Sequence, residues 1–301
     1  MNGPRTSNRG FTLIEAIVVI VITGILAGMV AVFIRTPVDG YLDAERRAGL
    51  TDIADTAVRR MARDIRLALP NSVRTSADGS GSCIEFIPTK IGARYRAEVD
   101  GTTGNGDPLD FTTIDDRFEM LWLNSALPAD SRIAAGDVVV VFNDGSASGN
   151  AYTGINAIQV AAVAEPGSTP NTTAISFVGT GAAAPFGRKQ LPSQSPGSRF
   201  QVIPAGSHVV SFRCAGGSLT RHTRVLGAAW TPPATCAAMV AGATSSVLAN
   251  HLGSCSLTYD PPGVSTGLSR FGIVSISLGI TDAASGETIP LYHQTHVDNT
   301  P

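Results

Sequence analysis

The chain has 301 residues, of which 43% are hydrophobic and only 15% are charged. A chain this apolar is not disordered, and it is long enough to bury a substantial core. Its 22 basic and 24 acidic side chains leave a net charge of −2. This balance argues against general nucleic-acid binding, because proteins of that class carry a basic excess. The 32 glycines and 18 prolines indicate that much of the chain is loop.

The hydrophobic excess lies near the N-terminus. Residues 11–34 read FTLIEAIVVIVITGILAGMVAVFI and contain one charged residue, Glu15. This run suffices for a membrane-spanning helix, which needs about 20 apolar residues. Arg5 and Arg9 precede it without an acidic residue, so we expect a cytoplasmic N-terminus and an outward-facing remainder. A cleaved secretory signal peptide is the alternative, but its apolar core spans only about 7–15 residues.

Glu15 needs an explanation, because a carboxylate in an apolar helix is costly without a partner, and the segment offers none. One interpretation places Glu15 at the level of the lipid headgroups. The other interprets the string RGFTLIE, which ends at Glu15, as a processing signal. Cleavage after Gly10 would create an ammonium group on Phe11, four residues before the carboxylate. The Glu15 of one subunit could then neutralise this ammonium on a neighbour and fix the register of packed helices.

The string RGFTLIE followed by an apolar run resembles the leader of type IV pilins and of type II secretion pseudopilins. Gly10, Phe11 and Glu15 match that leader one by one. The resemblance implies that a membrane aspartyl protease, the prepilin peptidase, cuts between Gly10 and Phe11, and that Phe11 is then N-methylated. One departure is Val32, which stands where many major pilins carry a helix-bending proline. The nearest proline is Pro37, beyond the apolar run.

After the apolar run, the sequence predicts an amphipathic helix. Apolar residues recur at steps of three and four, and charged residues occupy most of the other positions. The predicted apolar stripe comprises Leu50, Ile53, Ala57, Met61, Ile65 and Leu69. Acidic residues are interleaved with the arginines, which favours a solvated helix face over a site for DNA or anionic lipid. Pro70 is expected to stop the helix, and Gly40, close to Pro37, to break or bend it.

Beyond residue 71 the pattern changes to short apolar runs separated by Gly, Asn and Asp clusters, which predicts antiparallel strands. The predicted strands are Cys83–Pro88, Arg94–Glu98, Arg117–Leu123, Asp137–Phe142, Ala157–Val163, Thr173–Val178, His208–Cys214, Leu219–Val225, Cys255–Tyr259, Phe271–Ile280 and Ile289–His296. The short Ala215-Gly216-Gly217 segment predicts a hairpin between the strands on either side. No clear linker divides this region, so we expect one α+β head.

All four cysteines, Cys83, Cys214, Cys236 and Cys255, follow the apolar segment. An outward-facing compartment is oxidising, so two disulfides are expected, with three possible connectivities. The short stretch between Cys236 and Cys255 favours their pairing, which would leave Cys83 with Cys214. A site binding a metal through all four thiolates is disfavoured, because no C-x-x-C pair exists.

Sequence signals for catalysis or ligand binding are weak. Gly179–Ala184 fits a dinucleotide-binding fingerprint, but Pro185 follows at once and prevents the helix that the fingerprint requires. His293 and His296 would point to opposite faces of a strand, which opposes joint metal binding. Four acidic residues could supply oxygen ligands for calcium, but a solvated turn is the favoured interpretation: Asp107, Asp110, Asp115 and Asp116. We therefore expect no enzyme, no cofactor and no metal.

Further strings extend the resemblance to most of the chain. The pieces ADTAVRRMARDIRLALPNSVR, CIEFIPTKIGARYR and YHQTHVDNTP resemble the O-type minor pilins of mannose-sensitive haemagglutinin (MSHA) pilus systems. The overall size also resembles minor pseudopilin J of type II secretion. The resemblance implies a low-abundance subunit of the tip or initiation complex of a filament, with prepilin peptidase and other major and minor pilins as partners. A secretion pseudopilin and a tip adhesin for a surface or glycan remain alternatives.

The expected fold is α+β, with a long N-terminal helix packed on an antiparallel, β-rich, pilin-like head. Residues 1–10 are the predicted leader, 11–34 the membrane-spanning and assembly helix, 35–70 its amphipathic continuation and 71–301 the extracytoplasmic head. The expected location is the bacterial inner membrane, crossed once with the head in the periplasm, and then the pilus tip at the cell surface.

Overall fold

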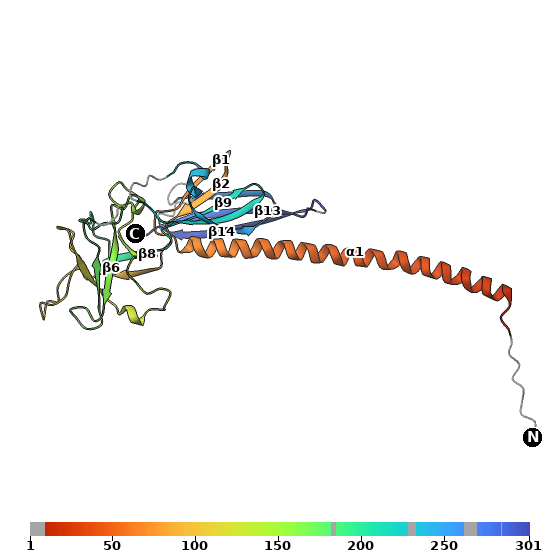
Figure 1. Cartoon of the computed structure of the whole chain (residues 1–301), viewed down its shortest axis with the longest axis horizontal. Helices are drawn as coiled ribbons and strands as arrows, with labels where there is room; N and C mark the ends of the chain where they lie inside the picture. Colours follow the sequence, from red (N-terminus) through yellow and green to blue (C-terminus); the bar gives the residue numbers. More distant parts are fainter. Residues whose placement is uncertain (1–9, 182–184, 228–232, 262–269, 284) are drawn as a thin grey trace, which may run out of the picture. The chain divides into compact units, whose positions relative to one another are not determined.

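The fold is taken from a computed structural model that describes residues 10–181, 185–227, 233–261, 270–283 and 285–301. The chain divides into two compact units, Met1–Thr51 and Asp52–Pro301. Helix α1 (Leu13–Arg66) contributes to both units, and all the strands belong to the second (Figure 1). The fold is thus α+β, as expected, with a long N-terminal helix and an antiparallel β-rich head.

In the first unit, α1 is helical throughout and its apolar side chains are exposed. The helix continues across Pro37 and Gly40, so the predicted break at this point is wrong. Proline inside a helix removes one hydrogen bond, but the bonds on both sides remain. Among the described residues, α1 is the one helix long and apolar enough to cross a membrane, and its most apolar stretch is not buried.

In the second unit, the last turns of α1 carry the apolar stripe that the sequence predicts, with one shift. Ala57, Met61 and Ile65 are buried, but Ile53 is 45% exposed, so its assignment to the stripe is wrong. Ala54 is buried in its place. The helix ends at Arg66, four residues before Pro70, and short-range bonds such as Ala68 N–H to Ile65 C=O close its last turn.

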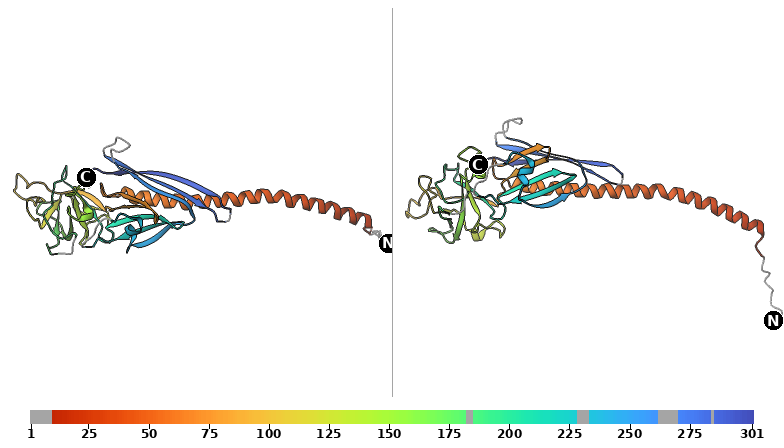
Figure 2. Two further views of the ribbon diagram at one scale, coloured as in Figure 1. Left: turned by 90° about the horizontal axis from the view of Figure 1, so that it is seen from above. Right: turned by 45° about the horizontal axis from the view of Figure 1, so that its top comes forward.

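The stripe packs into an antiparallel sandwich of two sheets (Figures 1 and 2). The larger sheet has the order β1-β2-β9-β10-β11 and the smaller one the order β12-β13-β14. Their bounds are β1 Arg74–Asp78, β2 Gly81–Phe86, β9 Val209–Ala215, β10 Ser218–Arg224, β11 Thr244–Ala249, β12 Leu252–Asp260, β13 Phe271–Thr281 and β14 Thr288–Asp298. The core between them joins Met61 and Ile65 of the helix to Phe212 of β9 and Ile276 of β13.

The remaining strands form a second lobe of the head. They are β3 Ile91–Arg94, β4 Arg117–Met120, β5 Val138–Val141, β6 Ala157–Ala164, β7 Thr173–Phe177 and β8 Arg199–Ile203. The sheet runs in the order β3-β8-β5-β6-β7-β4. Its two ends also meet, because Arg96 N–H donates to Glu119 C=O at 2.8 Å and Leu121 N–H donates to Arg94 C=O at 3.0 Å. The sheet therefore closes into a small barrel, which we call the barrel lobe, residues 88–207.

The barrel lobe is an insertion between two neighbouring strands of the sandwich. Strand β2 ends at Phe86 and β9 begins at Val209, yet β2 and β9 pair directly, with Phe86 opposite Val210. One side of the buried strand β5 fills the barrel through Val139 and Val141. Its other side packs, through Val138 and Val140, against residues at the root of the sandwich. The two lobes therefore share a hydrophobic contact at the point of insertion.

Most predicted strands are present, and the hairpin across Ala215-Gly216-Gly217 is confirmed as the β9–β10 pair. The predicted strand Arg94–Glu98 is displaced, because β3 ends at Arg94. Three strands and a short helix were not predicted: β1, β8, β11 and α2 (Cys236–Val240). Strand β11 reads TSSVLA and is mostly exposed, so it lacks the apolar alternation that marks a strand in a sequence.

The structure contains two disulfides, but the favoured pairing is wrong. Cys83 bonds to Cys236 with a Cα–Cα distance of 5.4 Å, and Cys214 bonds to Cys255 at 6.0 Å. Cys83 lies opposite Arg213 in the β2–β9 register, one position away from Cys214. Adjacent positions on a strand face opposite sides of a sheet, so Cys83 and Cys214 cannot meet. One bond instead ties α2 to the outer face of the larger sheet, and the other joins the two sheets.

Candidate functional site: the N-terminal segment and the polar clusters of the head

The predicted processing site lies immediately before α1. Gly10 and Phe11 precede the first helical residue, Leu13, and both are exposed, with Phe11 74% accessible. Peptide bonds outside regular structure are the ones that proteases reach most readily. The basic residues of the predicted leader, Arg5 and Arg9, lie outside the described residues.

Thr12 caps the helix, a role that the sequence analysis missed. Its Oγ1 accepts a hydrogen bond from Glu15 N–H and donates one to Glu15 Oε2, both at 3.4 Å. The first helical bond follows, from Ala16 N–H to Thr12 C=O at 3.2 Å. A threonine followed three residues later by glutamate is the signature of a capping box, so the signal was present in the sequence. Glu15 thus stabilises the start of the helix as well as carrying charge.

The side chains around Glu15 are apolar and exposed. Phe11, Leu13 and Ile14 are each more than 70% accessible, and the exposed stretch extends along the helix to Leu42. Exposed apolar area of this extent is a property of segments that enter a membrane or pack against other proteins. Glu15 also lies in the first turn, where a negative charge interacts favourably with the helix dipole.

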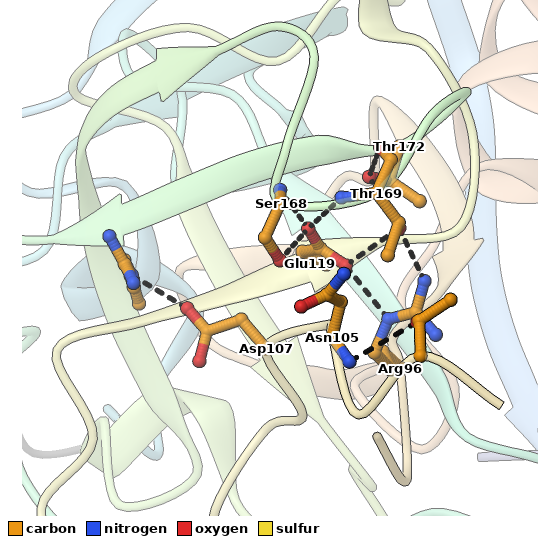
Figure 3. A network of polar contacts seen from close by, with 9 residues as sticks. Arg96, Asn105, Asp107, Glu119, Ser168, Thr169 and Thr172 are labelled. Atoms are coloured by element: carbon orange, nitrogen blue, oxygen red, sulfur yellow. Dashed lines mark hydrogen bonds and ion pairs between the residues drawn. The ribbon is translucent and has the colours of Figure 1, made fainter. Parts of the chain in front are cut away.

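The barrel lobe contains a buried carboxylate, Glu119, that is saturated by donors of the same chain (Figure 3). Its Oε1 accepts bonds from the backbone and hydroxyl of Ser168, and its Oε2 accepts from Arg96 Nε at 2.8 Å. Burial alone would raise the pKa of Glu119, but the bonds from Ser168 and Arg96 outweigh it and lower the pKa to about 2. A β-carbon on Gly167 would lie 2.5 Å from Oε1, so glycine is needed there. The cluster holds the 165–172 loop against β4.

The sandwich contains a second buried carboxylate, Glu85 on β2. Arg74 Nε donates to its Oε1 at 2.9 Å, and Arg224 Nη2 and Ser211 Oγ donate to its Oε2 at 2.7 and 3.0 Å. Tyr152 of the barrel lobe lies beneath Arg74, with the guanidinium carbon 4.6 Å from the ring centre. These contacts connect the outer face of the larger sheet to the barrel lobe, so Glu85 has a structural role.

The predicted metal candidates do not converge. His293 is partly buried and His296 is exposed, on opposite faces of β14 as expected. Asp110 accepts bonds from Thr112 and Thr113, and these bonds lower its pKa to about 2. The other three acidic residues are also engaged: Asp107 with Arg117, Asp115 with Asp110 N–H and Asp116 with Arg188. Among the described residues no group of three or more His, Cys, Asp or Glu side chains is placed to hold a metal.

The string that fits a dinucleotide fingerprint also forms no helix over its described part. Gly179 follows strand β7 after one residue, and the segment continues as irregular structure through Gly181. Ala182–Ala184 lie outside the described residues. Pro185 lies in a turn and no helix follows it, so the described part of this segment lacks the helix that the fingerprint requires.

Comparison with known proteins identifies the N-terminal segment. Residues 5–31 match the family model of the prokaryotic N-terminal methylation motif. No curated protein and no solved structure matches the chain significantly. The matched residues include Gly10, Phe11 and Glu15 and most of the exposed apolar run of α1, and a single apolar N-terminal helix of this kind is consistent with an anchor in the inner membrane. The prepilin-type motif therefore supports a type IV pilin-like protein, a pilin or pseudopilin that prepilin peptidase processes.

Proposed function

We propose that the protein is a minor pilin of an MSHA-like type IV pilus and acts in initiation or at the tip of the filament. Prepilin peptidase cuts it between Gly10 and Phe11, and Phe11 is N-methylated. The exposed apolar half of α1 first crosses the inner membrane once, with the N-terminus in the cytoplasm and the head in the periplasm. It then packs against the helices of other pilins. The observation that carries the proposal is the methylation motif at the start of an apolar, unburied helix.

The charge of Glu15 supports a role in assembly. Cleavage after Gly10 would place a new ammonium on Phe11, one residue before the Thr12 cap. A positive charge at a helix N-terminus is unfavourable, because the helix dipole is already positive there. A carboxylate in the first turn offsets this charge, and in a bundle of staggered helices the Glu15 of a neighbour can do the same.

The size of the head favours the tip over the shaft. The barrel lobe, residues 88–207, enlarges a sandwich that already buries the end of α1. In a shaft every subunit repeats the same contacts with its neighbours, so a bulky second lobe must be accommodated at every position. At the tip it is accommodated once. The resemblance of several strings to O-type MSHA minor pilins points the same way.

We further propose that the chain acts without catalysis of its own. Glu85 and Glu119, the most deeply buried carboxylates of the head, are each saturated by hydrogen-bond donors of the chain and hold loops and strands in place. A catalytic carboxylate needs a free oxygen within reach of a substrate. No nucleic-acid partner is proposed, since the net charge is −2.

The proposal is tested by Gly10→Ala in cells that lack the wild-type copy. The variant should stay uncut, which mass spectrometry of the N-terminus detects, and the number of pili per cell should fall strongly. Gly79→Ala is the matched control, because Gly79 lies in an open turn of the head where a β-carbon meets nothing within 4 Å. Normal piliation by uncut protein would refute the proposal.

The same cells separate the alternatives. Loss of protein export with intact pili would identify a pseudopilin of a type II secretion system. Loss of adherence with an unchanged number of pili would identify a tip adhesin. Glu15→Ala should leave cleavage intact and reduce incorporation into pili, and efficient incorporation of that variant would rule out the charge pairing.

A further inference from the structure

A polar cleft opens in the head beside strands β3 and β8, near the C-terminal end of the chain. Its volume is ≈ 370 Å³, within the range of about 300–1,000 Å³ that is typical of small-molecule sites. The outer face of β3 and β8 forms one wall. The segment that follows α1, at Ala68 and Pro70, and the C-terminal segment, at Asp298 and Thr300, form the other. All of these residues belong to the second unit of the chain.

Two arginines dominate the strand wall. Arg94 on β3 lies directly opposite Arg199 on β8 in the antiparallel register. A β-carbon on Gly197 would stand 3.8 Å from Arg94 Nη2 and 4.0 Å from Arg199 Nε, so both guanidinium groups flank the same turn. Neither group makes a hydrogen bond or an ion pair with any residue that the structure describes. Like charges directly opposite each other destabilise a sheet, so this pair costs stability as long as no anion lies between them.

The neighbouring position adds an unsatisfied amide. Gln201 on β8 faces the same side of the sheet as Arg199. Its partner on β3 is Gly92, which has no side chain to fill the cleft at this point. Gln201 Oε1 is buried and has no hydrogen-bond partner within the described part of the chain. Buried polar atoms are nearly always paired, so an unpaired amide oxygen in a cleft indicates a missing hydrogen-bond donor.

The opposite wall supplies acceptors. Asp298 Oδ1 accepts a bond from Thr300 N–H at 2.9 Å, and its other oxygen has no hydrogen bond within the part of the chain described. Asp298 forms no ion pair with Arg94 or Arg199. The cleft therefore presents guanidinium donors on one side and an acceptor-only carboxylate on the other. A ligand that satisfies both carries a negative charge at one end and hydrogen-bond donors, such as hydroxyl groups, at the other.

From this arrangement we propose that the cleft binds an acidic sugar, a pyranose with a carboxylate. The carboxylate lies between Arg94 and Arg199, which can each donate to it, and relieves their repulsion. Ring hydroxyls donate to Gln201 Oε1 and to Asp298. An aspartate or glutamate side chain of a partner protein fits less well, because it offers only acceptors and would be repelled by Asp298. The proposal concerns the isolated head and does not depend on the assembly of a pilus.

The test is a titration of the full-length protein, purified in detergent micelles, with glucuronate, followed by saturation-transfer difference NMR. Glucose is the matched probe, since it has the same hydroxylated ring without the carboxylate. Glucuronate should bind saturably, and glucose should bind about tenfold more weakly or not at all, because a charge-assisted hydrogen bond is lost. Equal binding of the two sugars, or binding of neither, would overturn the proposal.

Substitutions then locate the binding. Arg94→Gln and Arg199→Gln should each weaken glucuronate about tenfold, for the same reason. Neither should lower the melting temperature, since neither guanidinium makes a bond in the structure. Arg60→Gln is the matched control, because Arg60 is exposed on α1 and does not line the cleft. Unchanged affinity in both cleft variants would refute the site.

Two competition experiments test the chemical class. Sulfate at the same ionic strength should displace glucuronate poorly, because it lacks hydroxyl donors for Gln201 and Asp298. Displacement by sulfate at equal concentration would reduce the site to a general anion site and overturn the sugar assignment. Stronger displacement by a tetraglutamate peptide would assign the cleft to an acidic protein partner instead, which also overturns it.

Discussion

The two lobes of the head differ in where their stability comes from. The sandwich takes its core from residues far apart in the chain, with Met61 and Ile65 of α1 packed against strands near the C-terminus. Both disulfides lie in the sandwich, and its sheets have free edges. The barrel lobe is built from one continuous segment that contains no cysteine, and its sheet closes on itself. Its 165–172 loop is held by Glu119, which also pairs with Arg96. A sandwich that must hold a helix is thus reinforced by covalent bonds, whereas the barrel is stabilised locally.

The largest expected effect is on the contact between α1 and the sandwich. Ile65→Asp would bury an unpaired carboxylate at a position with no exposure, and should lower the free energy of unfolding by about 5 kcal/mol or more. Ile53→Asp is the control on the same helix, because Ile53 is 45% exposed, and it should change stability by less than about 1 kcal/mol. Urea unfolding in micelles measures the free energy of unfolding of both variants. A similar decrease in the two would contradict the assignment of Ile65, and not Ile53, to the buried stripe.

The second-largest effect should lower the stability of the sandwich without lowering that of the barrel lobe. Removing the bond between the two sheets with Cys214→Ser and Cys255→Ser together should cost about 4 kcal/mol, from the entropy of a loop of 41 residues. Hydrogen exchange should rise across the sandwich strands, and the inner strands of the barrel lobe, such as β5, should keep their protection. A uniform rise in exchange across both lobes would show that the lobes do not unfold separately.

A smaller effect should be confined to the barrel lobe. Glu119→Gln leaves the partly buried Arg96 without its counter-charge and should destabilise this lobe by about 3 kcal/mol. Glu98→Gln, at an exposed position of the same lobe, is the control and should be nearly neutral. The hydrogen-exchange rates of amides in β4 and β7 measure this effect. Protection in Glu119→Gln equal to that of the wild type would show that Glu119 does not stabilise the barrel lobe.

The same carboxylate predicts a dependence on pH. In the unfolded chain Glu119 takes up a proton near its ordinary pKa of 4.5, whereas in the folded lobe its pKa is about 2. The unfolded state therefore binds the proton first on acidification, so the contribution is complete above pH 4.5 and is lost as the pH falls towards 2. Glu119→Gln should remove this part of the acid sensitivity. Barrel-lobe exchange that depends on pH equally in both proteins would contradict the assignment.

The sequence predicts the parts of this molecule that depend on local patterns. The leader motif, the apolar and amphipathic halves of α1, most strands and the β9–β10 hairpin all follow from spacing along the chain. The short strand β11 was missed because its exposed side chains are polar and lack alternation. The helix also continues through Pro37, because one proline does not outweigh the hydrogen bonds on either side.

The features that the sequence could not predict depend on which strands become neighbours. The disulfide pairing follows from the β2–β9 register, which sets Cys83 and Cys214 on opposite faces. The opposition of Arg94 and Arg199 likewise exists only once β3 and β8 pair, and the two residues are far apart in the chain. Glu119 lies between Phe118 and Met120 in the sequence, and its burial depends on a loop that returns about 50 residues later.

The point at which the chain enters and leaves the barrel lobe has an evolutionary consequence. Because Phe86 and Val210 are direct partners, a turn of a few residues could join β2 to β9 and close the sandwich without the barrel. The register of the sandwich therefore does not depend on the barrel lobe, whose loss would leave both disulfides in place but would expose Leu69 and Ile87 at the point of insertion. Chains with the same helix and sandwich could in this way carry different inserted lobes, and recombination within a single hairpin would suffice to exchange them.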